Sequence, residues 1–150
     1  MSKRRYWFSF VLILFVAAFL RFYKLGQIPV SLYWDEAAIL LDAKVISQTG
    51  QDMHGGSWLQ VLFPSYGDFK LPVYIWLATL GVKLLGFTEL AVRLPSALVG
   101  LATIILSGLI SREIFFKFSN KKKDYLQLVT MLVVSISPWS VMFSRTAFEG

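Results

Sequence analysis

Long apolar stretches alternate with short polar segments along this chain. Three of these stretches, residues 6–23, 91–110 and 125–143, contain few polar side chains. A helix of about 20 apolar residues is long enough to cross the hydrocarbon core of a bilayer. The pattern therefore predicts three transmembrane helices.

A fourth apolar stretch, residues 71–86, is a weaker candidate. It would be only about 24 Å long as a helix, and it contains a charged residue, Lys83. Charged side chains are costly inside a bilayer. We therefore interpret this segment as a helix that lies at the outer membrane surface.

Residues 35–47 have the pattern of an amphipathic helix. Apolar residues recur on one side of it at helical spacing, at Ile39, Leu40, Ala43 and Ile46. Such a helix is expected to lie along the membrane surface. The predicted fold class is thus all-α and integral to the membrane, with three transmembrane helices and two amphipathic interfacial helices in the first extracytoplasmic loop.

Basic residues predict the orientation of these helices. The N-terminus contains Lys3, Arg4 and Arg5, and residues 111–124 hold five basic and two acidic side chains. Cytoplasmic segments are enriched in Lys and Arg, so both segments are assigned to the cytoplasm. An even number of crossings must separate them, which makes residues 24–90 one external loop. Six of the nine acidic residues fall in that loop, in agreement with this assignment.

The two ends of the chain add to this topology. No small-residue cleavage site follows residues 6–23, so we interpret this stretch as a retained signal anchor rather than a cleaved signal peptide. The segment after the third span, residues 144–150, emerges on the same side of the membrane as Asp35. Two separate polar segments therefore share the external face.

Composition excludes several classes of protein. A hydrophobic content of 56% is too high for an ordinary soluble domain of 150 residues. The net charge of +6 is explained by the basic flanks of the spans, so no nucleic-acid partner is predicted. The absence of cysteine excludes disulfides, a thiolate nucleophile and cysteine-ligated metals.

Three stretches resemble a known family. They are "WDEAAILLDAKVISQTG", "GDFKLPVYIWLATLGVKLLGFTELAVRLPSALVG" and "SPWSVMFSRTAFEG". In this order they resemble the N-terminal portion of GT-C superfamily membrane glycosyltransferases, such as protein O-mannosyltransferases and aminoarabinose lipid A transferases. The resemblance extends over essentially the whole chain. Catalytic members of the family have many more spans, so we expect these 150 residues to be one part of a polytopic enzyme and inactive alone.

The resemblance implies a reaction, a set of partners and a location. The donor would be a sugar linked to polyprenyl phosphate, and the acceptor would be a protein, a lipid or a glycan. Transfer would occur at the extracytoplasmic face of a bacterial or archaeal plasma membrane, among membrane lipids. A divalent metal is left open as a cofactor.

The resemblance also implies roles for particular residues. Asp35 and Glu36 would be catalytic, with the Asp35 carboxylate taking the proton of the acceptor hydroxyl. Lys70, and secondly Arg93, would hold the phosphate of the leaving group. Arg145 and Glu149, after the third span, would contact the substrate; at or near Glu149 the family pattern has Asp.

Each of these residues also has a structural interpretation. Asp35 and Glu36 suit the first turn of a helix, where carboxylates are favourable. Lys70 could extend to lipid phosphates without gripping a substrate, and Arg93 could anchor a helix to headgroups. Arg145 and Glu149 could form a helical ion pair, since they are four residues apart.

Two further alternatives remain open. His54, two residues after Asp52, could ligate a metal or could be a solvated loop residue. The protein as a whole could be a non-enzymatic transporter or assembly subunit, or a family member that binds the carrier lipid without catalysis. Ionisable residues buried within the spans would favour a transporter.

Overall fold

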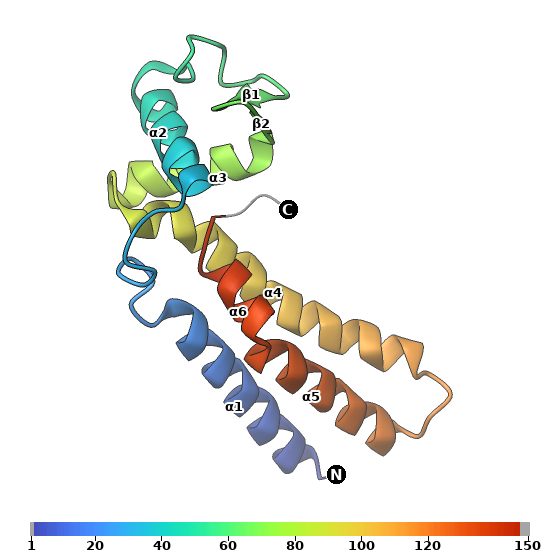
Figure 1. Ribbon diagram of the computed structural model, residues 1–150. Coiled ribbons are helices and arrows are strands. Elements are labelled where there is room, and N and C mark those ends of the chain that lie inside the picture. Colours follow the sequence, from blue (N-terminus) through green and yellow to red (C-terminus); the bar gives the residue numbers. More distant parts are fainter. Residues whose placement is uncertain (1, 148–150) are drawn as a thin grey trace. The chain divides into compact units, whose positions relative to one another are not determined.

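The computed structural model describes residues 2–147 of the chain, which form six helices and one two-stranded sheet (Figure 1). The helices are α1 (Lys3–Phe22), α2 (Trp34–Thr49), α3 (Pro72–Leu85), α4 (Glu89–Ile114), α5 (Asn120–Ile136) and α6 (Pro138–Ser144), and the strands are β1 (Phe63–Pro64) and β2 (Phe69–Lys70). The chain forms two compact units. Unit 1 comprises residues 2–23 and 98–144, and unit 2 comprises residues 24–97 and 145–147.

Unit 1 is built on the contact between α1 and α5. Its core consists of Ile13, Ala17, Ile104, Leu128 and Met131. At one end the hydroxyl of Tyr6 donates to Gln127 at 3.0 Å, and at the other Arg21 donates to the carbonyl oxygen of Ser135 at 3.1 Å. The two helices therefore run parallel.

Two helices of the described chain are long and apolar enough to cross a membrane, α1 and α4. They correspond to the predicted spans over 6–23 and 91–110. Helix α1 exposes large apolar side chains, including Phe8, Phe15 and Phe19. This surface is typical of a helix that faces lipid.

The predicted third span, residues 125–143, differs from a single straight helix. Helices α5 and α6 meet at an angle of 62°. They are long and apolar enough to cross a membrane only if the bent pair is taken as one span. The break falls at Ser137, just before Pro138. Proline has no N–H to donate and its ring clashes with the preceding turn, so a helix breaks or bends there.

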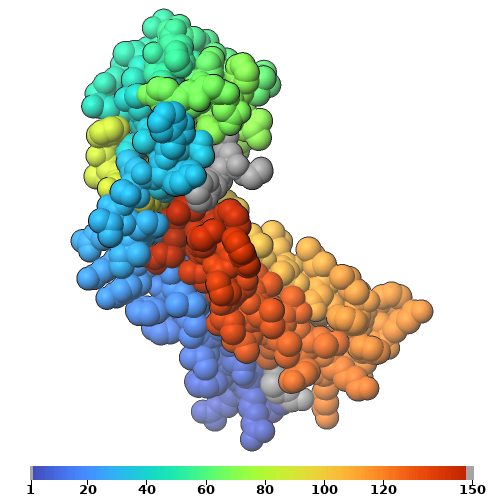
Figure 2. All heavy atoms as spheres, in the orientation of Figure 1, coloured from blue at the N-terminus to red at the C-terminus, as the bar shows by residue number. Residues whose placement is uncertain are grey.

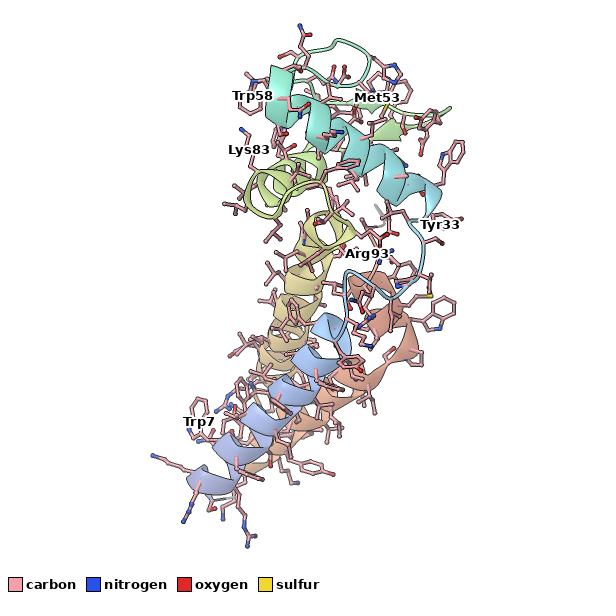
Figure 3. All side chains as sticks on the ribbon, turned by 90° about the vertical axis from the view of Figure 1, so that its left-hand side faces the viewer. Trp7, Tyr33, Met53, Trp58, Lys83 and Arg93 are labelled. Carbon is pink, nitrogen blue, oxygen red and sulfur yellow. The ribbon has the colours of Figure 1, made fainter. Side chains whose placement is uncertain are left out.

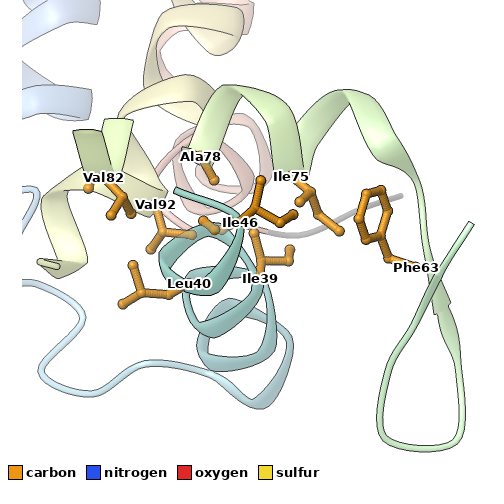
Figure 4. Packing of buried hydrophobic residues seen from close by; sticks show 11 residues of the cluster. Ile39, Leu40, Ile46, Phe63, Ile75, Ala78, Val82 and Val92 are labelled. Carbon is orange, nitrogen blue, oxygen red and sulfur yellow. The ribbon is translucent and has the colours of Figure 1, made fainter. Parts of the chain in front are cut away.

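In unit 2, α2 packs against α3 over an apolar core. The four residues predicted on one side of α2 are all buried in this core, which also contains Phe63, Ile75, Ala78, Val82 and Val92 (Figure 4). The helix ends at Gly50, whose φ of 74° lies in the left-handed region that favours glycine. The apolar face of α2 thus contacts protein, whereas the sequence pattern predicted contact with the membrane.

Helix α3 exposes a second apolar surface. Its inner face packs on α2, while Val73, Leu77, Leu80 and Leu84 are exposed on the rest of the helix. At 14 residues it is shorter than the span of a bilayer. The exposed side of α3 is therefore apolar, and the helix is too short to cross a bilayer without tilting or thinning it.

The strands form a small hairpin that the sequence pattern did not predict. Phe63 pairs with Lys70 and Pro64 with Phe69, and the turn contains Gly67 at φ 84°. Residues 50–62, drawn in blue-green, form part of the surface of unit 2 (Figure 2). The hairpin fixes the position of Lys70.

Candidate functional site

The neighbouring carboxylates Asp35 and Glu36 have different surroundings. The Asp35 side chain is 28% exposed and accepts a hydrogen bond from Lys70 at 2.6 Å. The Glu36 side chain is fully buried and accepts from Arg93 at 2.9 Å. The two residues belong to the first turn of α2, but they take part in two separate ion pairs.

Lys70 connects two carboxylates. It extends from β2, its side chain is only 7% exposed, and its ammonium donates to Asp35 and, at 3.2 Å, to Asp68. An ammonium group has three N–H donors. Two are used within the part of the chain that the structure describes, which leaves one for a ligand.

The charge state of Lys70 follows from these contacts. Burial lowers the pKa of its ammonium, but the hydrogen bonds and charges of Asp35 and Asp68 outweigh burial, and the net pKa is raised. The pKa of the exposed Asp68 carboxyl is lowered by the Phe69 N–H and by Lys70. Lys70 is therefore a cation at neutral pH, held next to Asp35.

Asp35 retains a free oxygen. Its Oδ1 accepts from Lys70, and its Oδ2 has no hydrogen-bond partner within residues 2–147. The neighbouring Trp34 packs edge-on against Tyr66 with ring centroids 5.1 Å apart, and both rings are exposed. Exposed aromatic rings of this kind are common where a protein meets lipid headgroups. The residue before Asp35 thus contributes to an exposed aromatic surface.

Arg93 and Glu36 form the centre of a buried network. Arg93 reaches from α4 toward the connection before α2 (Figure 3). Its guanidinium donates to both Glu36 oxygens and to Glu89, and also to the carbonyl oxygens of Leu25, Pro29 and Ser31. Glu36 also accepts from the backbone N–H of Tyr33 and of Ala147, both at 2.9 Å.

This network argues against two of the roles implied by the family resemblance. The side chains of Glu36 and Arg93 are both 0% exposed, and protein groups occupy both carboxylate oxygens and every guanidinium nitrogen. A buried guanidinium with all of its nitrogens bonded has no place for a lipid phosphate. The geometry indicates that Glu36 and Arg93 position the start of α2 and the preceding connection.

Only one of the two candidates near the C-terminus can be placed. Arg145 donates to the carbonyl oxygen of Ile28 at 3.0 Å, and burial together with the charge of Arg93 lowers its pKa. Glu149 lies outside the described residues, and so does the predicted pair of Arg145 with Glu149. Through its bond to Ile28, Arg145 contacts the connection before α2 within unit 2.

Two acidic side chains, Asp42 and Asp52, hold the loop after α2 in place. The sequence pattern did not predict this structural role. Asp42 is fully buried and accepts from the Met53 N–H at 2.9 Å. Asp52 accepts from the N–H groups of His54 and Gly56. Within residues 2–147, no three His, Cys, Asp or Glu side chains are close enough to hold a metal ion. The described part of the chain therefore gives no support to metal ligation by His54.

Asp42 and Asp52 differ in their ionisation. Burial raises the pKa of Asp42, whose Oδ2 has no hydrogen-bond partner among the described groups. Burial also acts to raise the pKa of Asp52, but hydrogen bonds from Gln60, Gly56 and His54 outweigh it, and the net pKa is lowered. The negatively charged form is therefore less favourable for Asp42 than for Asp52.

A hollow of about 270 Å³ lies between the end of α2 and α3. Its lining includes Trp58, Trp76 and Lys83, and the indole N–H of Trp76 donates to the Trp58 carbonyl oxygen at 2.8 Å. Trp58 and Lys83 extend from the same side of unit 2 in Figure 3. One wall of this hollow is an irregular loop, so no periodic pattern of residues predicts it.

Comparison with protein-family models, with curated proteins and with solved structures finds no match to this chain.

Proposed function

We propose that this protein is part of a membrane glycosyltransferase that takes a sugar from a polyprenyl-phosphate donor, with Asp35 as the base and Lys70 as the cation for the phosphate. One observation carries the proposal. A partly exposed carboxylate with one free oxygen lies 2.6 Å from a buried ammonium that has one free N–H. The family resemblance supplies the class of reaction.

The chemistry uses each of these groups once. The acceptor hydroxyl donates its proton to Asp35 Oδ2 as its oxygen forms a bond to the anomeric carbon. The bond from that carbon to the phosphate oxygen breaks, and the phosphate leaves with the electron pair. Lys70 stabilises the negative charge that develops on the departing phosphate. A single displacement of this kind inverts the anomeric carbon.

The location of the pair supports a lipid-linked donor. Lys70 is followed after one residue by α3, whose exposed side carries Val73, Leu77 and Leu84. An apolar helix surface of this kind binds at the headgroup boundary of a bilayer. A lipid phosphate lies at the same depth. The phosphate of a polyprenyl-phosphate sugar, and the anomeric carbon bonded to it, would therefore be within reach of Lys70.

The decisive variant is Asp35→Asn in the complete protein, assayed in membranes with polyprenyl-phosphate-linked sugars. Loss of general-base catalysis should lower kcat by about 10²- to 10⁴-fold. Asp68→Asn is the matched control, because it removes the other, exposed carboxylate on Lys70 and leaves Asp35 in place. Unchanged transfer by the Asp35→Asn protein would refute the proposal.

One observation favours the second candidate function, a transporter. Arg21 is fully buried in unit 1 and donates to Ser135 and Ser140 on either side of the break between α5 and α6. Ionisable groups near broken helices often mark a pathway through a membrane protein. Under this alternative, Arg21→Gln would abolish activity and Asp35→Asn would not.

A further inference from the structure

One end of unit 1 carries an excess of positive charge. Residues 1–9 and 111–124 together contain eight basic and two acidic side chains. One of the acids, Asp124, is already paired with Arg112 at 2.6 Å. Among the described residues, Arg4 and Arg5 form no ion pair, and both are exposed. These two guanidinium groups can therefore bind an external anion.

An apolar groove begins at the same end. It has a volume of about 410 Å³ and lies between α1, which contributes Leu12 and Val16, and α5, which contributes Leu128 and Leu132. Helices α1 and α5 are drawn side by side in Figure 1 and are parallel. The groove is thus lined by two parallel helices, α1 and α5.

The groove continues into the basic end of α1. A second hollow, of about 440 Å³, is lined by Arg4, Arg5, Phe8 and Ser9. Ser9 also lines the apolar groove, so the two hollows adjoin each other at this residue. An apolar groove next to two cations that form no ion pair matches an amphiphile that has a long apolar chain and an anionic head.

We propose that this surface binds an anionic glycerophospholipid, with one acyl chain between α1 and α5 and its phosphate against Arg4 and Arg5. Basic residues at the end of a transmembrane helix attract anionic headgroups, and guanidinium groups bind phosphate oxygens with two parallel hydrogen bonds. The site lies in unit 1 and uses neither Asp35 nor Lys70. It is therefore independent of the glycosyltransferase proposal.

The test is native mass spectrometry of the purified chain released from nanodiscs that contain phosphatidylcholine and phosphatidylglycerol in equal amounts. The wild-type protein should retain phosphatidylglycerol in preference. Arg4→Gln/Arg5→Gln should weaken this retention by about thirtyfold, since each basic residue near a membrane surface contributes about a fivefold factor. Val129→Trp, which fills the groove, should lower retention of both lipids.

The matched control is Lys117→Gln/Lys122→Gln. It removes the same charge from Lys117, in the α4–α5 connection, and from Lys122, in the first turn of α5. Lys117 lies over the ring of Phe116 and Lys122 over that of Phe118, and neither lysine lines a hollow named above. This control should retain phosphatidylglycerol like the wild type. Equal weakening in both double variants would mean diffuse attraction to the membrane and would overturn the proposal. A wild-type protein without preference for phosphatidylglycerol would also overturn it. So would a Leu12→Cys variant that crosslinks to a second copy of the chain, because that copy would then cover the groove.

Discussion

Unit 2 contains two ion pairs that begin at adjacent residues and have opposite properties. The pair of Glu36 with Arg93 has no exposed surface and uses both carboxylate oxygens, whereas the pair of Asp35 with Lys70 keeps an exposed carboxylate oxygen and a spare N–H. A saturated, buried pair stabilises one arrangement of the chain, because every group already has a partner. An unsaturated pair at the surface can exchange a partner for a substrate. Under the proposed function, the two neighbouring acids would divide positioning and chemistry between them.

The largest effect is expected from Glu36→Gln. It leaves the Arg93 charge buried without its carboxylate, and breaking such a pair costs about 3 to 5 kcal/mol of folding free energy. Thermal unfolding in detergent, followed by circular dichroism, measures this loss. Glu89→Gln is the control, since it removes a partly exposed carboxylate from the same guanidinium at 3.3 Å and should cost about 1 kcal/mol or less. A Glu36→Gln protein that is stable but inactive would instead assign Glu36 to the chemistry.

The second effect is expected from Lys70→Met, and it falls on activity more than on stability. Loss of the cation that stabilises the departing phosphate should lower kcat by about 10²- to 10³-fold. Transfer assays in membranes, with KM and kcat separated, measure this change. Lys83→Met provides the comparison, because Lys83 is an exposed lysine on the neighbouring α3 with no carboxylate contact among the described residues. Equal losses in the two variants would deny Lys70 a specific role.

The smallest effect is expected from Asp42→Asn, which tests burial without an ion pair. Because burial raises the folded-state pKa of Asp42 above its ordinary value of 3.8, its contribution to stability is full below that pH and is lost as pH rises through the raised pKa. The Asn variant keeps the acceptor for Met53 and should be more stable than the wild type at neutral pH, by about 1 kcal/mol. Unfolding at several pH values between about 4 and 8 should show a smaller pH dependence in the variant. An unaltered pH dependence would show that Asp42 is not the group responsible.

The apolar pattern of the sequence predicted helices at two of the three proposed spans and the buried face of α2. The stretches at 6–23 and 91–110 correspond to α1 and α4, and the residues predicted on one face of α2 are buried together. Periodicity depends on local spacing alone, so it can identify an apolar face. It cannot identify what covers that face, which is α3 in the case of α2.

The candidate site was harder to predict, because its contacts join residues that are far apart in the chain. Asp35 and Lys70 were both selected from the sequence, but their contact depends on a two-residue strand pairing that has no detectable period. The functional roles predicted for Glu36 and Arg93 depend on the family resemblance. Their mutual saturation, 57 residues apart, could not be seen without the fold. The break at Pro138 did have a signal in the sequence, the proline itself.

The contact between Glu36 and the Ala147 N–H has a consequence for biosynthesis. The acceptor emerges from the ribosome 111 residues before its donor. At about 5 to 20 residues per second, about 6 to 22 seconds pass between the synthesis of this carboxylate and that of its partner. In a chain whose synthesis stops before residue 147, Glu36 in the first turn of α2 would therefore lack this hydrogen bond.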